Sequence, residues 1–172
     1  NVRTPSSIVG PRHVAAKMQD DQENDIVGDT NLATGQLAAG ALATATFATA
    51  TDTPGFESVA TVSFTTAGRV EVGGKVKLVM PDEAGAQHSW RFADNKNPSV
   101  ETDGTNNPPA IAFTTPGADA PTAGTVGYTV NTRTLIFTVG DNDLAQATAH
   151  VFTITNTLTP SSVVAVNNVA AT

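Results

Sequence analysis

The chain has 172 residues, a formal net charge of −7 at pH 7, 15% charged residues and no cysteine. The acidic balance argues against nucleic acid and anionic membrane surfaces as partners, since both require clustered lysine and arginine, and the missing cysteine excludes disulfides, thiolate catalysis and zinc–sulfur sites. Roughly one residue in six is threonine, a β-branched residue that suits pleated, half-wet strands, so the composition favours an all-β protein.

The first 40 residues differ from the rest of the chain, because basic residues are followed by an acidic block at 20–25 and then by spaced glycines. A helical turn over 13–18 would be too short to be stable on its own. We therefore predict an extended N-terminal arm over residues 1–40 that depends on a partner, or on the rest of the chain, for its order. Because the sequence begins at Asn1 rather than at methionine, we expect a processed mature chain or an excised segment.

Residues 41–172 alternate apolar and polar positions with a period of two, which places one face of each strand in a core and the other in water. The predicted strands lie at 42–51, 60–65, 75–80, 87–92, 126–130, 135–139 and 150–155, with a last apolar run at 163–166. The short connection Asn131-Thr132-Arg133 predicts a hairpin. These features predict an all-β domain over 41–172, an antiparallel, immunoglobulin-like β-sandwich of about eight or nine strands.

Two long polar loops, at 93–109 and 114–124, interrupt the strands. Loops of this kind lie on the surface and are the usual position of a binding site on a β scaffold. A glycan or another ligand would be bound there, so a glycan-binding module is an alternative function. Sugar-binding β domains usually present exposed aromatic rings, whereas Trp90, the single tryptophan, falls on the apolar side of its strand and is expected in the core.

A glycine-rich stretch that ends in Lys75 raises the question of a phosphate-binding loop. Such a loop requires G-x-x-x-x-G-K-[ST] followed by a helix. Counted from Gly68, the second glycine is Gly73, but Gly74 follows it, and Lys75 is followed by Val76 and by a strand pattern. We interpret Gly73-Gly74 instead as a turn with positive φ angles before a core strand.

The three histidines, His13, His88 and His150, form no recognisable metal motif. His88 and His150 fall on the apolar side of their strands, where a lone histidine is usually hydrogen-bonded in the core or at an edge. No G-x-S-x-G nucleophile elbow is present, and the serine pair at 161–162 is typical of a turn. The sequence therefore predicts no catalytic residue, no cofactor and no enzymatic activity.

Aspartate and asparagine residues gather at 20–25, at 103–106 and at 140–143. None of these segments matches the twelve-residue calcium loop, which requires a terminal glutamate. Calcium held between strands by scattered ligands is an alternative for the second and third segments. The same residues also favour turns, because their side chains bond nearby backbone groups, and the first segment is typical of a solvated charge run. We assign no metal ligand.

Two segments resemble a module found in secreted repeat proteins of algae and other protists. Residues 58–82, SVATVSFTTAGRVEVGGKVKLVMPD, resemble its threonine-rich strand followed by an apolar-GG-K-apolar strand that closes on Pro-Asp. Residues 134–162, TLIFTVGDNDLAQATAHVFTITNTLTPSS, resemble its later half. The resemblance spans about residues 42–162 and implies a β-sandwich that builds cell-surface or appendage material, such as flagellar hair (mastigoneme-like) proteins, without catalytic residues. The N-terminal arm has no counterpart in that module.

We therefore predict a non-catalytic structural module of an extracellular or cell-surface assembly, such as a filament, appendage or wall. The expected partners are further copies of the chain or a larger protein assembly, reached through the arm over 1–40, which can add a strand to an open sheet edge. Nucleic acid is not expected as a partner. Insertion into a membrane is not expected either, because no apolar run approaches the ~20 residues that span a bilayer. The alternatives are the glycan-binding module and a viral capsid-decoration or fibre protein.

Overall fold

The computed structural model of the chain falls into two units, Asn1–Gly40 and Ala41–Thr172. It describes residues 13–19, 22, 25–33, 42–81, 90–94, 101–102, 107–116, 120–161 and 170–171. Most of the predicted strand at 87–92 and the whole apolar run at 163–166 therefore lie outside the described residues, as do His88 and the aspartate-containing segment at 103–106.

The N-terminal unit contains a two-stranded antiparallel sheet, which we call the N-terminal hairpin. Strand β1 (His13–Gln19) pairs with β2 (Asp25–Ala33), with His13 opposite Ala33 and Gln19 opposite Asp25. The sequence predicted an extended arm over residues 1–40 and did not predict this pairing between two of its segments. The physical reason for the pairing is that each strand supplies hydrogen-bonding groups for the main chain of the other.

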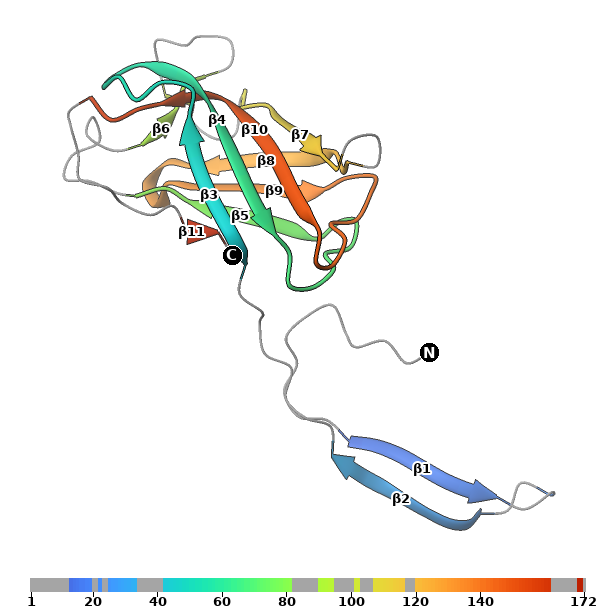
Figure 1. The fold of residues 1–172 in the computed structure, drawn as a ribbon. Helices are drawn as coiled ribbons and strands as arrows, with labels where there is room; N and C mark the ends of the chain where they lie inside the picture. Colours follow the sequence, from blue (N-terminus) through green and yellow to red (C-terminus); the bar gives the residue numbers. More distant parts are fainter. Residues whose placement is uncertain are drawn as a thin grey trace. The chain divides into compact units, whose positions relative to one another are not determined.

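The first sheet of the second unit is antiparallel, with the order β3-β4-β10-β6 and with β7 also paired to β10 (Figure 1). Its strands are β3 (Ala43–Thr49), β4 (Glu57–Thr65), β6 (Arg91–Phe92), β7 (Ile111–Thr115) and β10 (Ala149–Leu158). Buried residues alternate with exposed or partly buried ones along β4, and with partly buried ones along most of β10, as expected for strands with one face in a core.

The second sheet is also antiparallel and has the order β11-β5-β9-β8. Its strands are β5 (Lys75–Val79), β8 (Ala123–Thr129), β9 (Thr134–Val139) and β11 (Ala170–Ala171). The predicted hairpin is confirmed: β8 and β9 are joined by the short 3₁₀ turn η3 (Val130–Thr132), which closes on Arg133.

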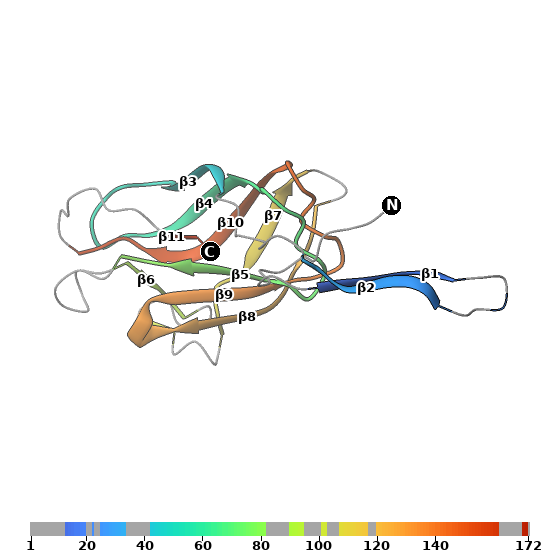
Figure 2. The same ribbon diagram turned by 90° about the horizontal axis from the view of Figure 1, so that it is seen from below.

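The two sheets face each other across one core, and Figure 2 shows them as two layers. The ring of Phe137 on β9 lies 5.2 Å from that of Phe152 on β10, and the ring of Tyr128 on β8 lies 5.0 Å from that of Phe92 on β6. These edge-on contacts join residues of opposite sheets and suit the charge distribution of aromatic rings. Together with the strand pairing, they confirm the predicted all-β fold with two antiparallel sheets. We call this part the two-sheet unit.

The sequence did not predict strand β7. Ile111 and Phe113 are partly buried and pack against the core, but the strand has only five residues and lies between the two proline-containing loops. A run this short carries two apolar positions on its inner side, which is too few for a period of two to stand out.

Candidate functional site

The glycine-rich stretch forms a turn and not a phosphate-binding loop. The Gly74 N–H donates to the Glu71 carbonyl over 2.8 Å, and the Gly73 N–H donates to the Val139 carbonyl over 2.8 Å. Strand β5 then begins at Lys75, so no helix N-terminus faces the turn. The interpretation as a turn before a core strand is confirmed.

The prediction of positive φ angles holds for only one of the two glycines. Gly73 has a φ of +84°, whereas Gly74 has no positive φ. At Gly74 any side chain would collide with its neighbours. A Cβ atom there would lie 2.5 Å from the side chain of Val70 and 2.8 Å from the Glu71 carbonyl oxygen.

The acidic turn at 140–143 uses its carboxylates to join strands. Asp141 Oδ1 accepts hydrogen bonds from the Thr122 N–H (3.0 Å) and hydroxyl (2.9 Å). Asp143 pairs with Arg69 and accepts a hydrogen bond from the Val72 N–H over 2.8 Å. The hydrogen bonds from Thr122 lower the pKa of Asp141, and those from Arg69 and Val72 lower the pKa of Asp143. Asp141 therefore links this turn to the residue just before β8, and Asp143 links it to the segment between β4 and β5.

His150 is fully buried beneath the first sheet, as its position on the apolar side of the strand predicted. Its ring packs against Phe64 and Phe113 at centroid distances of 5.8 Å and 6.5 Å. Nε2 lies 3.4 Å from the Ala145 carbonyl oxygen, whereas Nδ1 has no hydrogen-bond partner. Burial lowers the pKa of His150, and the contact with the Ala145 carbonyl opposes this in part. The lowered pKa keeps the buried ring neutral near pH 7.

A charged cluster closes the end of the β8–β9 hairpin. Arg133 Nη1 donates to Glu101 Oε1 over 2.5 Å, and the Tyr128 hydroxyl donates to the same oxygen over 3.2 Å. Arg133 has a φ of 50°, in the left-handed region. Burial raises the pKa of Tyr128 to about 12. The cluster ties the hairpin to the segment that follows β6, and its groups are used within the fold.

The described residues contain no group of three His, Cys, Asp or Glu side chains able to hold a metal ion. In the same part of the chain, no helix is long and apolar enough to cross a membrane. Among the described residues that the sequence singled out for chemistry, His150, Asp141 and Asp143 are engaged in structural contacts.

Strand β10 changes partners at a β-bulge. Its first part pairs with β7, whereas Thr157 pairs with β6. Opposite β4 the register shifts between Ile154 and Thr157, so that Thr155 and Asn156 together face Val59. Asn156 has a φ of 56°, which asparagine tolerates better than most residues. An extra residue of this kind bends the strand and increases its local twist.

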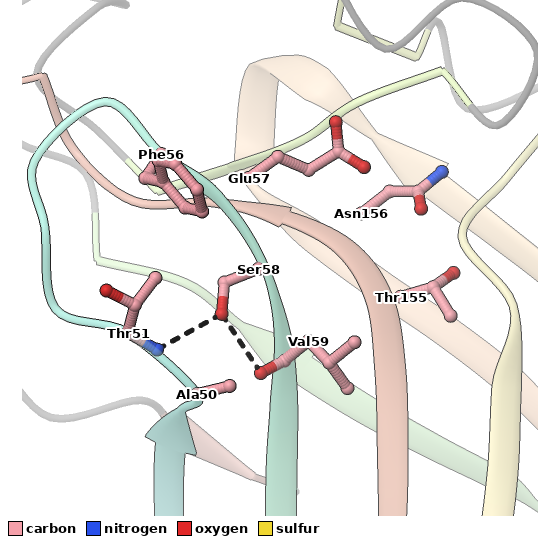
Figure 3. A pocket seen from close by; sticks show the side chains of 8 residues that line it. All are labelled: Ala50, Thr51, Phe56, Glu57, Ser58, Val59, Thr155 and Asn156. Atoms are coloured by element: carbon pink, nitrogen blue, oxygen red, sulfur yellow. Dashed lines mark hydrogen bonds between the residues drawn. The ribbon is translucent and has the colours of Figure 1, made fainter.

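A hollow of about 460 Å³ lies beside this bulge (Figure 3). It is lined by Ala50, Thr51, Phe56, Glu57, Ser58, Val59, Thr155 and Asn156. Phe56 is 55% exposed and Val59 is 41% exposed, so two apolar side chains stand largely in water. The Ser58 hydroxyl accepts a hydrogen bond from the Thr51 N–H over 3.3 Å, which fixes the chain between β3 and β4 at this point. The hollow offers apolar area with polar groups at its rim, and it lies at the end of β3.

Strand β3 forms one edge of the first sheet and pairs, among the described residues, with β4 alone. The Ala50 N–H donates to the Val59 carbonyl over 2.9 Å, so Ala50 and Val59 form a hydrogen-bonded pair. Alternate residues of an antiparallel strand point their main-chain groups to opposite sides. The N–H and C=O groups of Phe47 and Thr49 therefore point away from β4, toward the open side of the sheet.

No protein-family model, no curated protein and no solved structure matches this chain. The candidate site is thus defined by its geometry: the open edge of β3 and the hollow at its end, with Phe56 and Val59 exposed. The sequence offered the loops at 93–109 and 114–124 as the place for a binding site, but none of the described residues of these loops lines the hollow. Trp90, which the sequence predicted in the core, is only partly buried; it packs against the core and lies edge-on to Phe47.

Only a weak sequence signal marked this site. Phe56 follows Pro54-Gly55 and breaks the alternation of apolar and polar residues, which is the one local sign of an apolar side chain on the outer surface. The bulge at Asn156 leaves no such sign, because it depends on which strands become neighbours.

Proposed function

We propose that the chain is a non-catalytic structural module of an extracellular or surface assembly, and that neighbouring copies are joined through the N-terminal unit. The observation that supports this is that, among the described residues, the N-terminal hairpin is a sheet of only two strands. A two-stranded hairpin is marginally stable in water, and three strands or a packing partner are usually needed. A neighbouring copy that pairs with this hairpin would stabilise it and would at the same time connect the two copies.

The architecture of the two-sheet unit supports the same proposal. The carboxylates of Asp141 and Asp143 and the pair formed by Arg133 and Glu101 are engaged in links between loops and strands. These contacts hold the unit together, as a structural building block requires. We propose that the unit is an immunoglobulin-like sandwich and that the assembly lies at the cell surface or outside the cell, in keeping with the threonine-rich strands.

The experiment that tests this proposal is a comparison of assembly size. The full chain, a chain that lacks residues 1–33 and a chain with residues 13–33 replaced by glycine and serine are studied by sedimentation velocity over a range of concentrations. We expect the full chain to associate and both variants to stay monomeric, with unchanged circular dichroism per residue for the two-sheet unit. The second variant controls for length. If all three associate equally, the N-terminal unit is not the joint.

A glycan-binding module is a second candidate, and the hollow is the observation that favours it. Phe56 offers an exposed aromatic face, and the exposed Glu57 offers a carboxylate at the rim. A glycan array followed by calorimetric titration tests it. Binding that is lost in Phe56→Ala and kept in Val72→Ala, a truncation of another exposed apolar residue, would support this function over the first.

A further inference from the structure

Among the described residues, the edge of β3 has one of the features that usually protect an open strand, a bulge at its start, but it carries no charge and no proline. Natural edge strands carry lysine, proline or inward-pointing charges, or they are very short, because an open edge otherwise pairs with another chain. Strand β3 has seven residues, ATATFAT, with no charge and no proline. Its one irregularity is a bulge between Ala43 and Thr46, with Thr44 at a φ of 50°. From Thr46 onward the edge is regular.

The regular part of this edge is also the part next to the apolar hollow. Thr46 to Thr49 keep an unbroken register with β4, and Ala50, the next residue but one after Ala48, lines the hollow. A strand added along β3 would gain main-chain hydrogen bonds from Phe47 and Thr49. Its continuation would lie beside Phe56 and Val59, where side chains can be covered. Main-chain bonds for affinity and a side-chain hollow for specificity are the two elements of strand addition.

We propose that the edge of β3 is the acceptor for strand β1 of a second copy of this chain. This inference rests on the proposed function, because it names the surface that receives the N-terminal unit. Within the described residues, β1 pairs only with β2 and β3 pairs only with β4. Each has one open side, and both are seven residues long. Joining them turns two incomplete sheets into one.

Charge selects β1 over β2 as the strand that pairs. Asp52 and Glu57 are exposed close to the end of β3. Strand β1, HVAAKMQ, contains Lys17 and no carboxylate, whereas β2, DIVGDTNLA, contains Asp25 and Asp29. Placing β2 at this edge would bring like charges together, and placing β1 there avoids this repulsion.

The first test removes from β3 a main-chain N–H group that points away from β4. In Thr49→Pro, the ring replaces an N–H that points away from β4, a position at which an edge strand tolerates proline. We expect association of the full chain, measured by sedimentation velocity, to weaken at least tenfold, while circular dichroism and thermal unfolding show a folded two-sheet unit. Association that is unchanged in a folded Thr49→Pro chain overturns the inference.

A second pair of variants keeps the test decisive if Thr49→Pro does not fold. Ala48 on β3 lies opposite Thr61 on β4, and both are exposed. Ala48→Lys places a charge on the edge strand, and Thr61→Lys places the same charge one strand further in. We expect Ala48→Lys to weaken association more than Thr61→Lys. Equal effects would show that the edge is not the acceptor.

Crosslinking identifies the strand that pairs with β3. Because the chain has no native cysteine, only the introduced cysteines can react. Full-length Ala16→Cys is mixed with full-length Ala48→Cys and treated with a short bismaleimide, and Thr61→Cys replaces Ala48→Cys in the control. We expect mixed dimers with Ala48→Cys well above those with Thr61→Cys. Dimers formed mainly within the Ala48→Cys population would show that β3 pairs with β3 of the second copy, and would overturn the assignment of β1.

The two proposals fail in different ways. If the full chain associates, the chain lacking residues 1–33 does not, and folded Thr49→Pro still associates, the acceptor is not β3 but the proposed function stands. If the full chain stays monomeric at every concentration, the proposed function fails, and the inference about β3 fails with it.

Discussion

Phe47 on strand β3 lies edge-on to Trp90, with ring centroids 5.3 Å apart and ring planes at 88°. Phe47 is the one residue of β3 whose ring reaches the core, and Trp90 is the only tryptophan of the chain. This contact links an otherwise exposed edge strand to Trp90, which also packs against the core. It also gives the edge a natural reporter, because tryptophan emission responds to the water around the ring.

Phe47→Ala is expected to destabilise the two-sheet unit by about 2 kcal/mol, below the 3–5 kcal/mol of a fully buried phenylalanine because Phe47 is only partly buried. The emission of Trp90 should shift to the red as water reaches the ring. Urea unfolding followed by fluorescence and by circular dichroism measures both effects. Thr46→Ala, on the exposed face of the same strand, is the control, with an expected cost of about 1 kcal/mol for its lost bond to Ser63. Equal costs for the two variants would show that β3 is not anchored through Phe47.

Tyr128 is expected to make the fold sensitive to alkaline pH. Its folded-state pKa is raised to about 12, whereas an unfolded tyrosine has a pKa near 10. The unfolded chain therefore loses this proton first, so the free energy of unfolding should fall by about 2–3 kcal/mol between pH 10 and pH 12. Because Tyr128 is the only tyrosine, absorbance of the phenolate at rising pH reads its titration directly. A midpoint near 10 in the folded protein would contradict the buried cluster.

Tyr128→Phe is the matched variant for this experiment. It keeps the ring that packs against Phe92 and removes the group that titrates. The difference in unfolding free energy between the two proteins should grow smaller from pH 10 to pH 12. A constant difference across this range would mean that other groups cause the alkaline loss of stability.

His150 is expected to make the fold sensitive to mild acid. Burial lowers its folded-state pKa, so on acidification below about 6.5 the unfolded chain takes up a proton that the folded chain resists. The free energy of unfolding should therefore decrease from pH 7.5 to pH 5.5. The carboxylates of Asp141 and Asp143 have lowered pKa values and stay ionised over this range, so they do not contribute.

The measurement is urea unfolding at pH 7.5 and pH 5.5 for the natural chain and for His150→Leu, which fills a similar volume without a titrating group. We expect the pH dependence to be smaller in His150→Leu. His13→Gln, in the N-terminal hairpin, is the control and should keep the full pH dependence of the two-sheet unit. Equal pH dependence in the natural chain and His150→Leu would rule out His150 as the sensor.

The strands could be predicted from sequence wherever one face of a strand is buried along its length. On β5, Val76 and Leu78 are buried while Lys75 and Lys77 are exposed, so chemistry and position alternate together. The burial of His150 followed from the same argument. The N-terminal hairpin was missed because the acidic block between its strands resembled a solvated charge run and not a connection between paired strands.

The candidate site could not be predicted because it depends on neighbours in space. The hollow exists where Val59 of β4 meets the bulge at Thr155 and Asn156, almost a hundred positions later in the chain. Likewise, β3 is an edge only because nothing described pairs on its far side. Local periodicity records which face of a strand is buried, and it carries no information about the order of strands in a sheet.

The glycine turn before β5 allows a final prediction with an internal control. Gly73→Ala should destabilise the unit by about 1–2 kcal/mol, because alanine resists the φ of +84°. Gly74→Ala should cost about 1–3 kcal/mol, because its Cβ atom would overlap Val70 and the Glu71 carbonyl. Gly68→Ala meets no atom within 4 Å and has no positive φ, so its effect should stay within about 0.5 kcal/mol. Thermal and urea unfolding rank the three variants, and a Gly68→Ala cost as large as that of Gly74→Ala would contradict the described turn.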